Sequence, residues 1–148
     1  MYRQAVAIIP RALVAGLLAA AVWTSGASAQ TTLTTSLTGA AERPGPGSAN
    51  GSGTATVTLD PAAGSVCYDL TVTLSPPAAA AHIHRGAADA SGPVVVPFDA
   101  PTTGTSTNCA VGVDAALIAE IIQTPSAFYV NVHNPEFQAG AIRGQLGQ

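Results

Sequence analysis

Two neighbouring stretches of this chain alternate strictly between apolar and polar residues, and this alternation constrains the fold more than any other feature. Residues 54–59 place Ala, Val and Leu on one face and threonines on the other, and residues 66–74 repeat the pattern with Val, Tyr and Leu. A period of two residues predicts half-buried β-strands. The segment Asp60–Gly64 between them has the Pro and Gly of a tight turn, so the two stretches predict a β-hairpin.

Shorter stretches bounded by Gly, Pro or Asn predict further strands, namely 33–38 at a sheet edge, 80–85, 94–98, 128–133 and 141–146. One segment differs, because Asp114 is a good N-cap residue, Pro125 suits a helix end, and the apolar residues between them share a helical face (Leu117, Ile118, Ile121 and Ile122). The sequence therefore predicts an all-β fold, an antiparallel β-sandwich or Greek-key barrel with one short helix.

The first thirty residues contain the three parts of a secretory signal peptide. Arg3 and Arg11 are positive, residues 12–23 are apolar, and Ala27-Ser28-Ala29 fits a small-x-small cleavage site. The apolar part is shorter than the roughly 20 residues that a membrane-spanning helix needs. We therefore expect a signal peptide at 1–29, a single β domain at 30–148 with no membrane span, and a secreted, periplasmic or cell-envelope location.

The expected mature domain is acidic. It keeps all eight acidic residues but only three arginines, and the chain has no Lys, so its net charge with neutral His is −5. Phosphate backbones need basic patches for affinity, and nucleic acid is therefore not expected as a partner. An extracellular or cell-envelope partner of unknown identity fits the expected location.

The chain has two cysteines, Cys67 and Cys109. In an oxidising compartment an even pair predicts a structural disulfide. A disulfide between these two cysteines closes a loop of about 40 residues, which stabilises a fold by about 4 kcal/mol in the chain-entropy account. Two free thiols that act as metal ligands or redox groups are the alternative, although the chain has no CxxC motif.

All three histidines of the chain lie in expected strands or at their ends. His82 and His84 form a His-x-His pair on one face of a strand, where alternate Cα atoms lie about 6–7 Å apart. His133 ends a later strand, on the face that it shares with Tyr129 and Asn131. If the two strands are neighbours, the imidazoles form a site for Zn²⁺ or Cu²⁺, with Tyr129, Asn131 and Arg143 as polar support.

The same histidines also allow a purely structural role, since imidazoles at strand ends often bond to carbonyls and a polar cluster can hold sheet geometry. Glu136 and Asp89, in adjoining loops, are candidates for further ligands. For Arg143 we expect a salt bridge with Asp69 or Glu136; the alternative is that it orients an acidic ligand or a carboxylate near the histidines.

Several enzyme motifs are absent, among them G-x-S-x-G, HExxH, the Walker loop and G-x-G-x-x-G. Three functions stay open: a binding or structural module whose histidines hold a metal, a small mononuclear copper or zinc metalloenzyme, and an adhesion or matrix domain whose histidines serve only the fold. A copper-zinc dismutase site needs more imidazole ligands than the three available here.

Six motifs in this order resemble the CHRD domain, a family named for chordin: residues 37–44 (LTGAAERP), 51–55 (GSGTA), 81–86 (AHIHRG), 92–95 (GPVV), 129–133 (YVNVH) and 140–146 (GAIRGQL). The similarity spans roughly Leu33 to Leu146. It implies a secreted all-β domain and places all three histidines inside family motifs, but it implies no activity. Ala141 departs from the Glu that many members carry in a G-E-I-R-G-Q block. If that Glu pairs with the Arg or His groups of the family, Arg143 needs another partner here.

Overall fold

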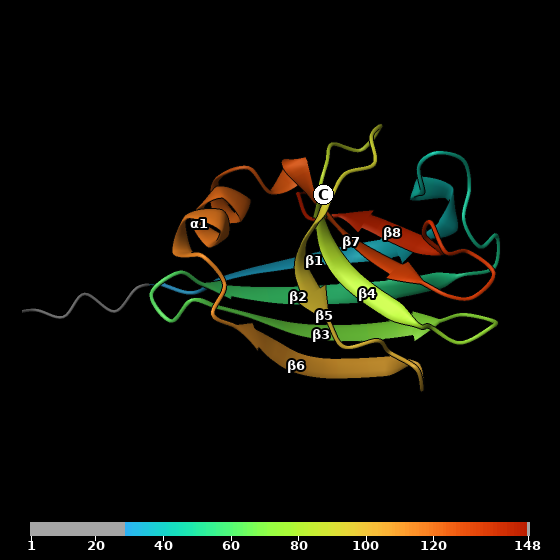
Figure 1. Ribbon diagram of the computed structural model, residues 1–148, viewed down its shortest axis with the longest axis horizontal. Helices are drawn as coiled ribbons and strands as arrows, with labels where there is room; N and C mark the ends of the chain where they lie inside the picture. Colours follow the sequence, from blue (N-terminus) through green and yellow to red (C-terminus); the bar gives the residue numbers. More distant parts are fainter. Residues whose placement is uncertain (1–28, 148) are drawn as a thin grey trace, which may run out of the picture.

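The computed structural model of the protein describes residues 29–147; residues 1–28 of the expected signal peptide lie outside this range. The chain forms one antiparallel sheet that curls into a nearly closed barrel (Figure 1), with the strand order β5-β4-β7-β8-β1-β2-β3-β6. The strands are β1 (Thr31–Thr38), β2 (Ser52–Asp60), β3 (Ser65–Thr73), β4 (Ala80–Arg85), β5 (Val94–Phe98), β6 (Thr105–Val111), β7 (Phe128–His133) and β8 (Ile142–Gln145). The prediction of an antiparallel all-β fold is confirmed, with the barrel as its form.

The strict alternation of β2 and β3 produces the expected hairpin. The two strands pair residue for residue from Ser52 opposite Thr73 to Asp60 opposite Ser65. The Asp60 carboxylate accepts hydrogen bonds from the backbone of Ala62 and Ala63 and so closes the turn. The apolar residues of both strands point into the barrel and form the centre of the core, including Val57, Leu59, Val66 and Leu70.

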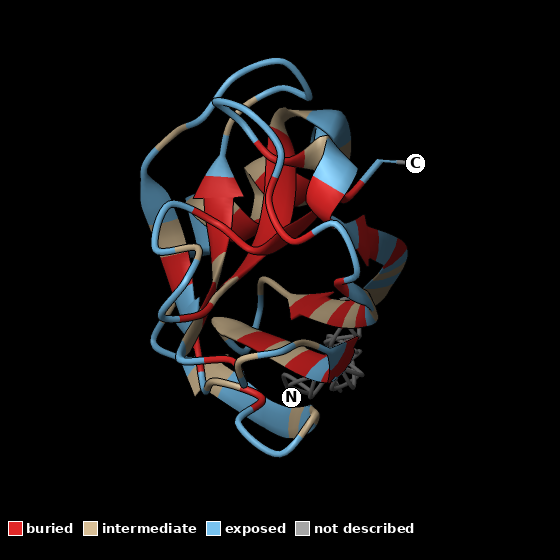
Figure 2. Ribbon diagram, turned by 90° about the vertical axis from the view of Figure 1, so that its right-hand side faces the viewer, coloured by how far each residue is buried: buried red, intermediate tan, exposed pale blue. Residues whose placement is uncertain are grey.

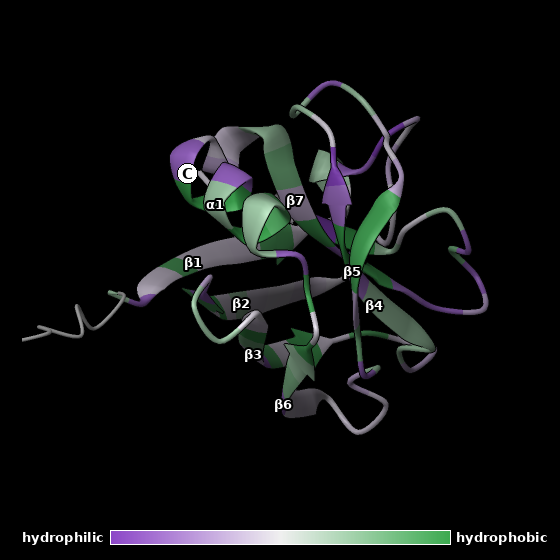
Figure 3. Cartoon of the chain, turned by 60° about the vertical axis from the view of Figure 1, so that its left-hand side comes forward, coloured by the Kyte–Doolittle hydropathy of each residue, from purple (hydrophilic) through white to green (hydrophobic). Residues whose placement is uncertain are grey.

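Side chains close the barrel where its two edge strands, β5 and β6, meet without pairing. Tyr68 of β3 stacks on Phe98 of β5, with ring centroids 4.0 Å apart. The Tyr68 hydroxyl accepts from the backbone N–H of Asp99 at 2.7 Å, and the Asn108 amide of β6 donates to the Asp99 carboxylate. β5 carries a run of apolar residues, green in Figure 3, and its Val96 and Phe98 are buried in the core.

Two features of the sheet differ from the sequence predictions. β6 was not predicted, because its residues alternate weakly and none of them is fully buried. β1 was expected at an edge but lies between β2 and β8, pairing with β2 from Thr31 to Thr38. Hydrophobic alternation reports which face of a strand is buried, whereas the neighbours of a strand depend on contacts distant in sequence.

The predicted helix is confirmed as α1 (Ala115–Gln123). The Asp114 side chain caps it by accepting from the backbone of Ala116, and Ile118 and Ile121 are buried in the core at one end of the barrel (Figure 1). A surface ion pair between Arg85 and Glu120 links β4 to α1. No helix in residues 29–147 has the length and apolar character needed to cross a membrane.

The strands β4, β7 and β8 are adjacent and are buried on both faces, so that β7 and β8 are almost entirely red in Figure 2. Their inner face holds apolar core residues such as Ile83, Val130 and Ile142. Their outer face carries polar residues that we call the outer polar layer: His82, His84, Tyr129, Asn131, His133, Arg143 and Gln145. This layer contains the three histidines and the polar support residues Tyr129, Asn131 and Arg143 of the predicted metal site.

Candidate metal centre

The pairing of β4 with β7 brings the three histidines together. In this antiparallel register His84 lies opposite Tyr129, His82 opposite Asn131 and Ala80 opposite His133. The ring centroid of His82 lies 5.5 Å from that of His84 and 5.1 Å from that of His133. The centroids of His84 and His133 are 5.8 Å apart. One ligand atom from each ring falls within 4.8 Å of the other two, so a single ion can reach all three.

One nitrogen of each imidazole is buried without a hydrogen-bond partner: His82 Nδ1, His84 Nε2 and His133 Nε2. Buried polar atoms in folded proteins are almost always paired, because an unpaired one costs about 1–3 kcal/mol. Here three such atoms belong to one cluster of neighbouring rings. A group of three histidines in this arrangement could hold a metal ion.

Two loops set the tautomers of two of these rings. His84 Nδ1 lies 2.9 Å from the carbonyl oxygen of Gly92, and His133 Nδ1 lies 3.0 Å from that of Gln138. A carbonyl only accepts, so each Nδ1 donates its proton and, in the neutral ring, Nε2 keeps its lone pair. An imidazole whose second nitrogen donates to a carbonyl is the usual partner arrangement of a metal-ligating histidine.

Burial keeps these rings neutral. It is the largest cause that lowers the pKa of all three histidines, and together with the neighbouring His133 and His84 it brings the pKa of His82 to about 4. Arg143 adds to the lowering at His84, while the bonds to Gly92 and Gln138 act in the opposite direction on His84 and His133. At neutral pH the lone pairs are thus free for a cation.

Tyr129 holds His84 in place. Its ring stacks on the His84 imidazole with centroids 5.0 Å apart, and its hydroxyl accepts from the backbone N–H of Gly92 at 3.1 Å. Gly92 thus receives a hydrogen bond from His84 and gives one to Tyr129. Cζ of the Arg143 guanidinium lies over the Tyr129 ring, 3.4 Å from its centroid.

The expected salt bridge of Arg143 with Asp69 or Glu136 is wrong. Arg143, which is 1% exposed, donates instead to the carbonyls of Ala87 and Ala90 and to the side chain of Gln145. Burial lowers its pKa. Gln145 in turn donates to the carbonyls of Gly86 and Ser126, so both residues fasten the loop that carries Gly92 over the outer polar layer.

Glu42 belongs to this site, although the sequence analysis did not identify it. The residue is 3% exposed, and both of its carboxylate oxygens accept from Nδ2 of Asn131, at 2.8 and 2.9 Å. Burial raises its pKa to about 7, against the opposing effects of Asn131, Arg143 and Arg43. Glu42 precedes a Pro- and Gly-rich segment that looks solvent-exposed in the sequence, and no local pattern there indicates burial.

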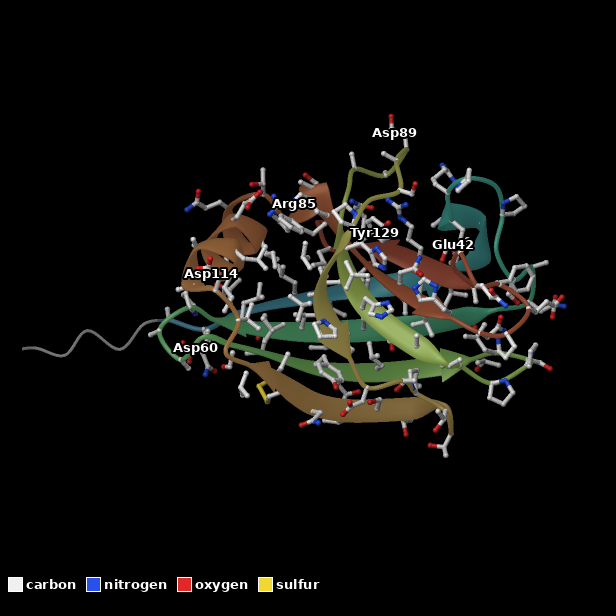
Figure 4. All side chains as sticks on the ribbon, viewed as in Figure 1. Glu42, Asp60, Arg85, Asp89, Asp114 and Tyr129 are labelled. Carbon is white, nitrogen blue, oxygen red and sulfur yellow. A yellow bond between two sulfur atoms is a disulfide. The ribbon has the colours of Figure 1, made fainter. Side chains whose placement is uncertain are left out.

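The other candidate ligands lie apart from the histidines. Glu136 and Asp89 are both exposed, and Asp89 points away from the barrel at the tip of its loop, whereas the labelled Tyr129 and Glu42 lie over the sheet (Figure 4). Among the described residues, the three histidines form a metal-capable group without an acidic member. Cys67 and Cys109 form the predicted disulfide, between the paired strands β3 and β6, and so are not free thiols.

Three neutral imidazoles suit a borderline cation such as zinc or copper. Three protein ligands leave a fourth coordination position for solvent or another small ligand, as in catalytic zinc sites, whereas structural zinc sites have four protein ligands. Three imidazole ligands therefore suit a site that only holds a metal ion, and they also suit a site where a small ligand binds reversibly to that ion.

Comparison with known proteins places the chain by its sequence. No curated protein and no solved structure gave a significant match to it. A family model described as the CHRD domain matches residues 33–146, from the third residue of β1 to the residue after β8, and includes all three histidines. The chain therefore belongs to the CHRD domain family.

Proposed function

We propose that this protein is an extracytoplasmic metal-binding module that holds one zinc or copper ion on His82, His84 and His133. The observation that carries the proposal is a cluster of three imidazoles, each with one buried nitrogen that lacks a hydrogen-bond partner and each offering a ligand atom within 4.8 Å of the other two. Two of these unpaired nitrogens belong to rings whose other nitrogen is already held by a carbonyl. A cation supplies the partner that all three atoms lack.

The location outside the cytoplasm is part of this proposal. The Cys67–Cys109 disulfide supports it, because disulfides persist in oxidising compartments. The signal-like features of residues 1–29 support it independently. The partner we propose is an extracellular or cell-envelope component, since the acidic mature domain does not suit nucleic acid.

A mononuclear metalloenzyme is the second candidate. A three-histidine ion has an open coordination position at which a substrate or an activated water can bind. An enzyme would convert a substrate bound at this position into product, whereas a binding module would only bind and release ligands there. Activity assays become informative once the metal is identified.

Metal content tests the proposal directly. The protein is exported to the periplasm of an expression host without a polyhistidine tag, stripped with a chelator, and titrated with Zn²⁺ and Cu²⁺ in competition with a chromophoric chelator. We expect one equivalent of ion per chain, and a loss of affinity of about 100-fold or more in His84→Ala. Glu136→Gln, which changes an exposed acid in a neighbouring loop, is the matched control and should bind like the wild type.

Stability provides a second readout. An ion that binds only the folded state stabilises it by about 4 kcal/mol at a thousandfold excess over its Kd. The wild type and Glu136→Gln should show this stabilisation, and His84→Ala should not. Failure of both metals to bind or stabilise the wild type would mean that the histidines serve only the architecture of the barrel.

A further inference from the structure

The described residues contain four buried side-chain atoms without a hydrogen-bond partner, and all four lie in the outer polar layer. Three are the imidazole nitrogens, and the fourth is Oδ1 of Asn131. Asn131 is 2% exposed and lies directly opposite His82, two residues before His133 on the same face of β7. The unpaired oxygen thus belongs to the same small region as the unpaired nitrogens.

The orientation of the Asn131 amide is fixed by Glu42. Nδ2 donates to both carboxylate oxygens, and above its pKa of about 7 Glu42 can only accept, so Oδ1 then occupies the branch of the amide that points away from Glu42. Glu42 itself has little room to move. A Cβ added to Gly140 would lie 2.3 Å from Oε2 of Glu42, and one added to Gly47 would lie 2.7 Å from its Cγ.

Oδ1 of Asn131 cannot pair with Nε2 of His84 or Nε2 of His133. Nε2 of His84 and Nε2 of His133 carry lone pairs, because their rings donate through Nδ1 to Gly92 and Gln138. An amide oxygen is also an acceptor. A group of acceptors requires a cation for the nitrogens and a hydrogen-bond donor for the oxygen. Water bound to a metal ion provides both at once.

We propose that Asn131 Oδ1 accepts a hydrogen bond from the water at the open position of the ion, so that this position favours ligands that carry a proton over anions that carry none. The inference rests on the metal-binding function proposed above. It makes Asn131 a residue that determines ligand specificity and Glu42 the residue that positions it. The substitution Asn131→Leu tests it, since it removes the acceptor at similar volume.

The test uses the cobalt-loaded protein, in which visible absorption reports binding of azide, an anion without a proton. In the wild type azide must displace water that is hydrogen-bonded to Asn131. In Asn131→Leu that hydrogen bond is lost, and we expect azide to bind about fivefold or more tightly. Glu136→Gln is the control for general effects on anion binding and should match the wild type.

The outcomes separate this inference from the proposed function. If the wild type and Asn131→Leu both bind one cobalt ion and their azide affinities differ by less than fivefold, the role of Asn131 is wrong and metal binding stands. If the wild type binds no cobalt, zinc or copper, both proposals fail. Should Asn131→Leu not fold, a crystal structure of the zinc-loaded wild type decides.

In that structure we expect a solvent molecule on the zinc that lies within about 3.2 Å of Asn131 Oδ1. Direct ligation of the zinc by Oδ1, at about 2.0–2.2 Å, would overturn the inference. An Asn131 amide whose Oδ1 points away from the zinc would also overturn the inference.

Discussion

Glu42 has a buried carboxylate that interacts with the guanidinium groups of Arg143 and Arg43. Desolvation disfavours its ionised form, whereas Asn131, Arg143 and Arg43 favour it. Desolvation is the larger effect, and the pKa rises from its ordinary value of 4.5 to about 7. The residue that orients Asn131 therefore changes its charge near neutral pH, and its contribution to stability depends on pH.

We predict that Glu42 destabilises the fold increasingly as the pH rises from 4.5 to 7. Below pH 4.5 the carboxyl is protonated in both states. Between the two values the unfolded chain releases its proton while the folded chain keeps it, so the free energy of unfolding falls, by about 3 kcal/mol in total. Urea denaturation of the metal-free wild type and Glu42→Gln at several pH values measures this effect.

The comparison between the two proteins isolates Glu42. The histidines have lowered pKa values and act in the opposite direction, since the folded state loses stability as the pH falls below their ordinary value of 6.5. They are common to both proteins, so the difference between the two curves reports Glu42 alone. Parallel pH profiles would show that Glu42 titrates normally.

At the scale of elements, the loop between β4 and β5 connects the sheet to the metal site. Arg143 and Gln145 of β8 hold this loop through the carbonyls of Ala90 and Gly86, and Gly92, near the end of the loop, orients His84 through its own carbonyl. The loop returns very close to β4 at this point. A Cβ added to Gly92 would lie 1.6 Å from the carbonyl oxygen of Arg85, so only glycine fits there without displacement of the backbone.

We predict that Gly92→Ala weakens metal binding by about 10- to 100-fold while the barrel stays folded. The added methyl group displaces the loop, and His84 loses the carbonyl that sets its tautomer. Zinc titration against a chelator measures the affinity, and circular dichroism checks the fold. Ser91→Ala, at an exposed neighbouring position in the same loop, is the control. An unchanged zinc affinity in Gly92→Ala would show that the carbonyl does not orient the ligand.

For the whole molecule, the metal site and the disulfide lie in different parts of the sheet. β4 and β7 form the site, whereas the disulfide joins β3 to β6 at the far end of the strand order. β6 is an edge strand without a fully buried residue, so its attachment depends on backbone pairing with β3 and on this covalent link. Stability and metal binding should therefore be separable by mutation.

We predict that the double substitution Cys67→Ser, Cys109→Ser lowers the free energy of unfolding by about 4 kcal/mol, as the chain-entropy account gives for a sequence separation of 42 residues. Zinc affinity at a temperature where the variant is folded should equal that of the wild type. Urea denaturation and chelator competition provide the two values. A large loss of zinc affinity in the folded variant would mean that the two regions are coupled.

Local sequence patterns determined the secondary structure and the faces of the strands. The alternation in β2 and β3 predicted their hairpin, the spacing around Asp114 predicted α1, and the position of His133 relative to Val130 and Val132 placed it on the face opposite the core. Such patterns suffice because a strand or a short helix buries one face, and burial of that face requires apolar residues at a fixed period.

Only the tertiary structure decided which strands are neighbours and what the polar residues contact. It placed β4 beside β7, which brings the histidines together, and β1 inside the sheet. It buried Glu42 against Asn131, 89 residues away in the chain, and satisfied Arg143 with loop carbonyls in place of a carboxylate. These contacts join residues far apart in sequence, and their free energy depends on burial and geometry that no local pattern encodes.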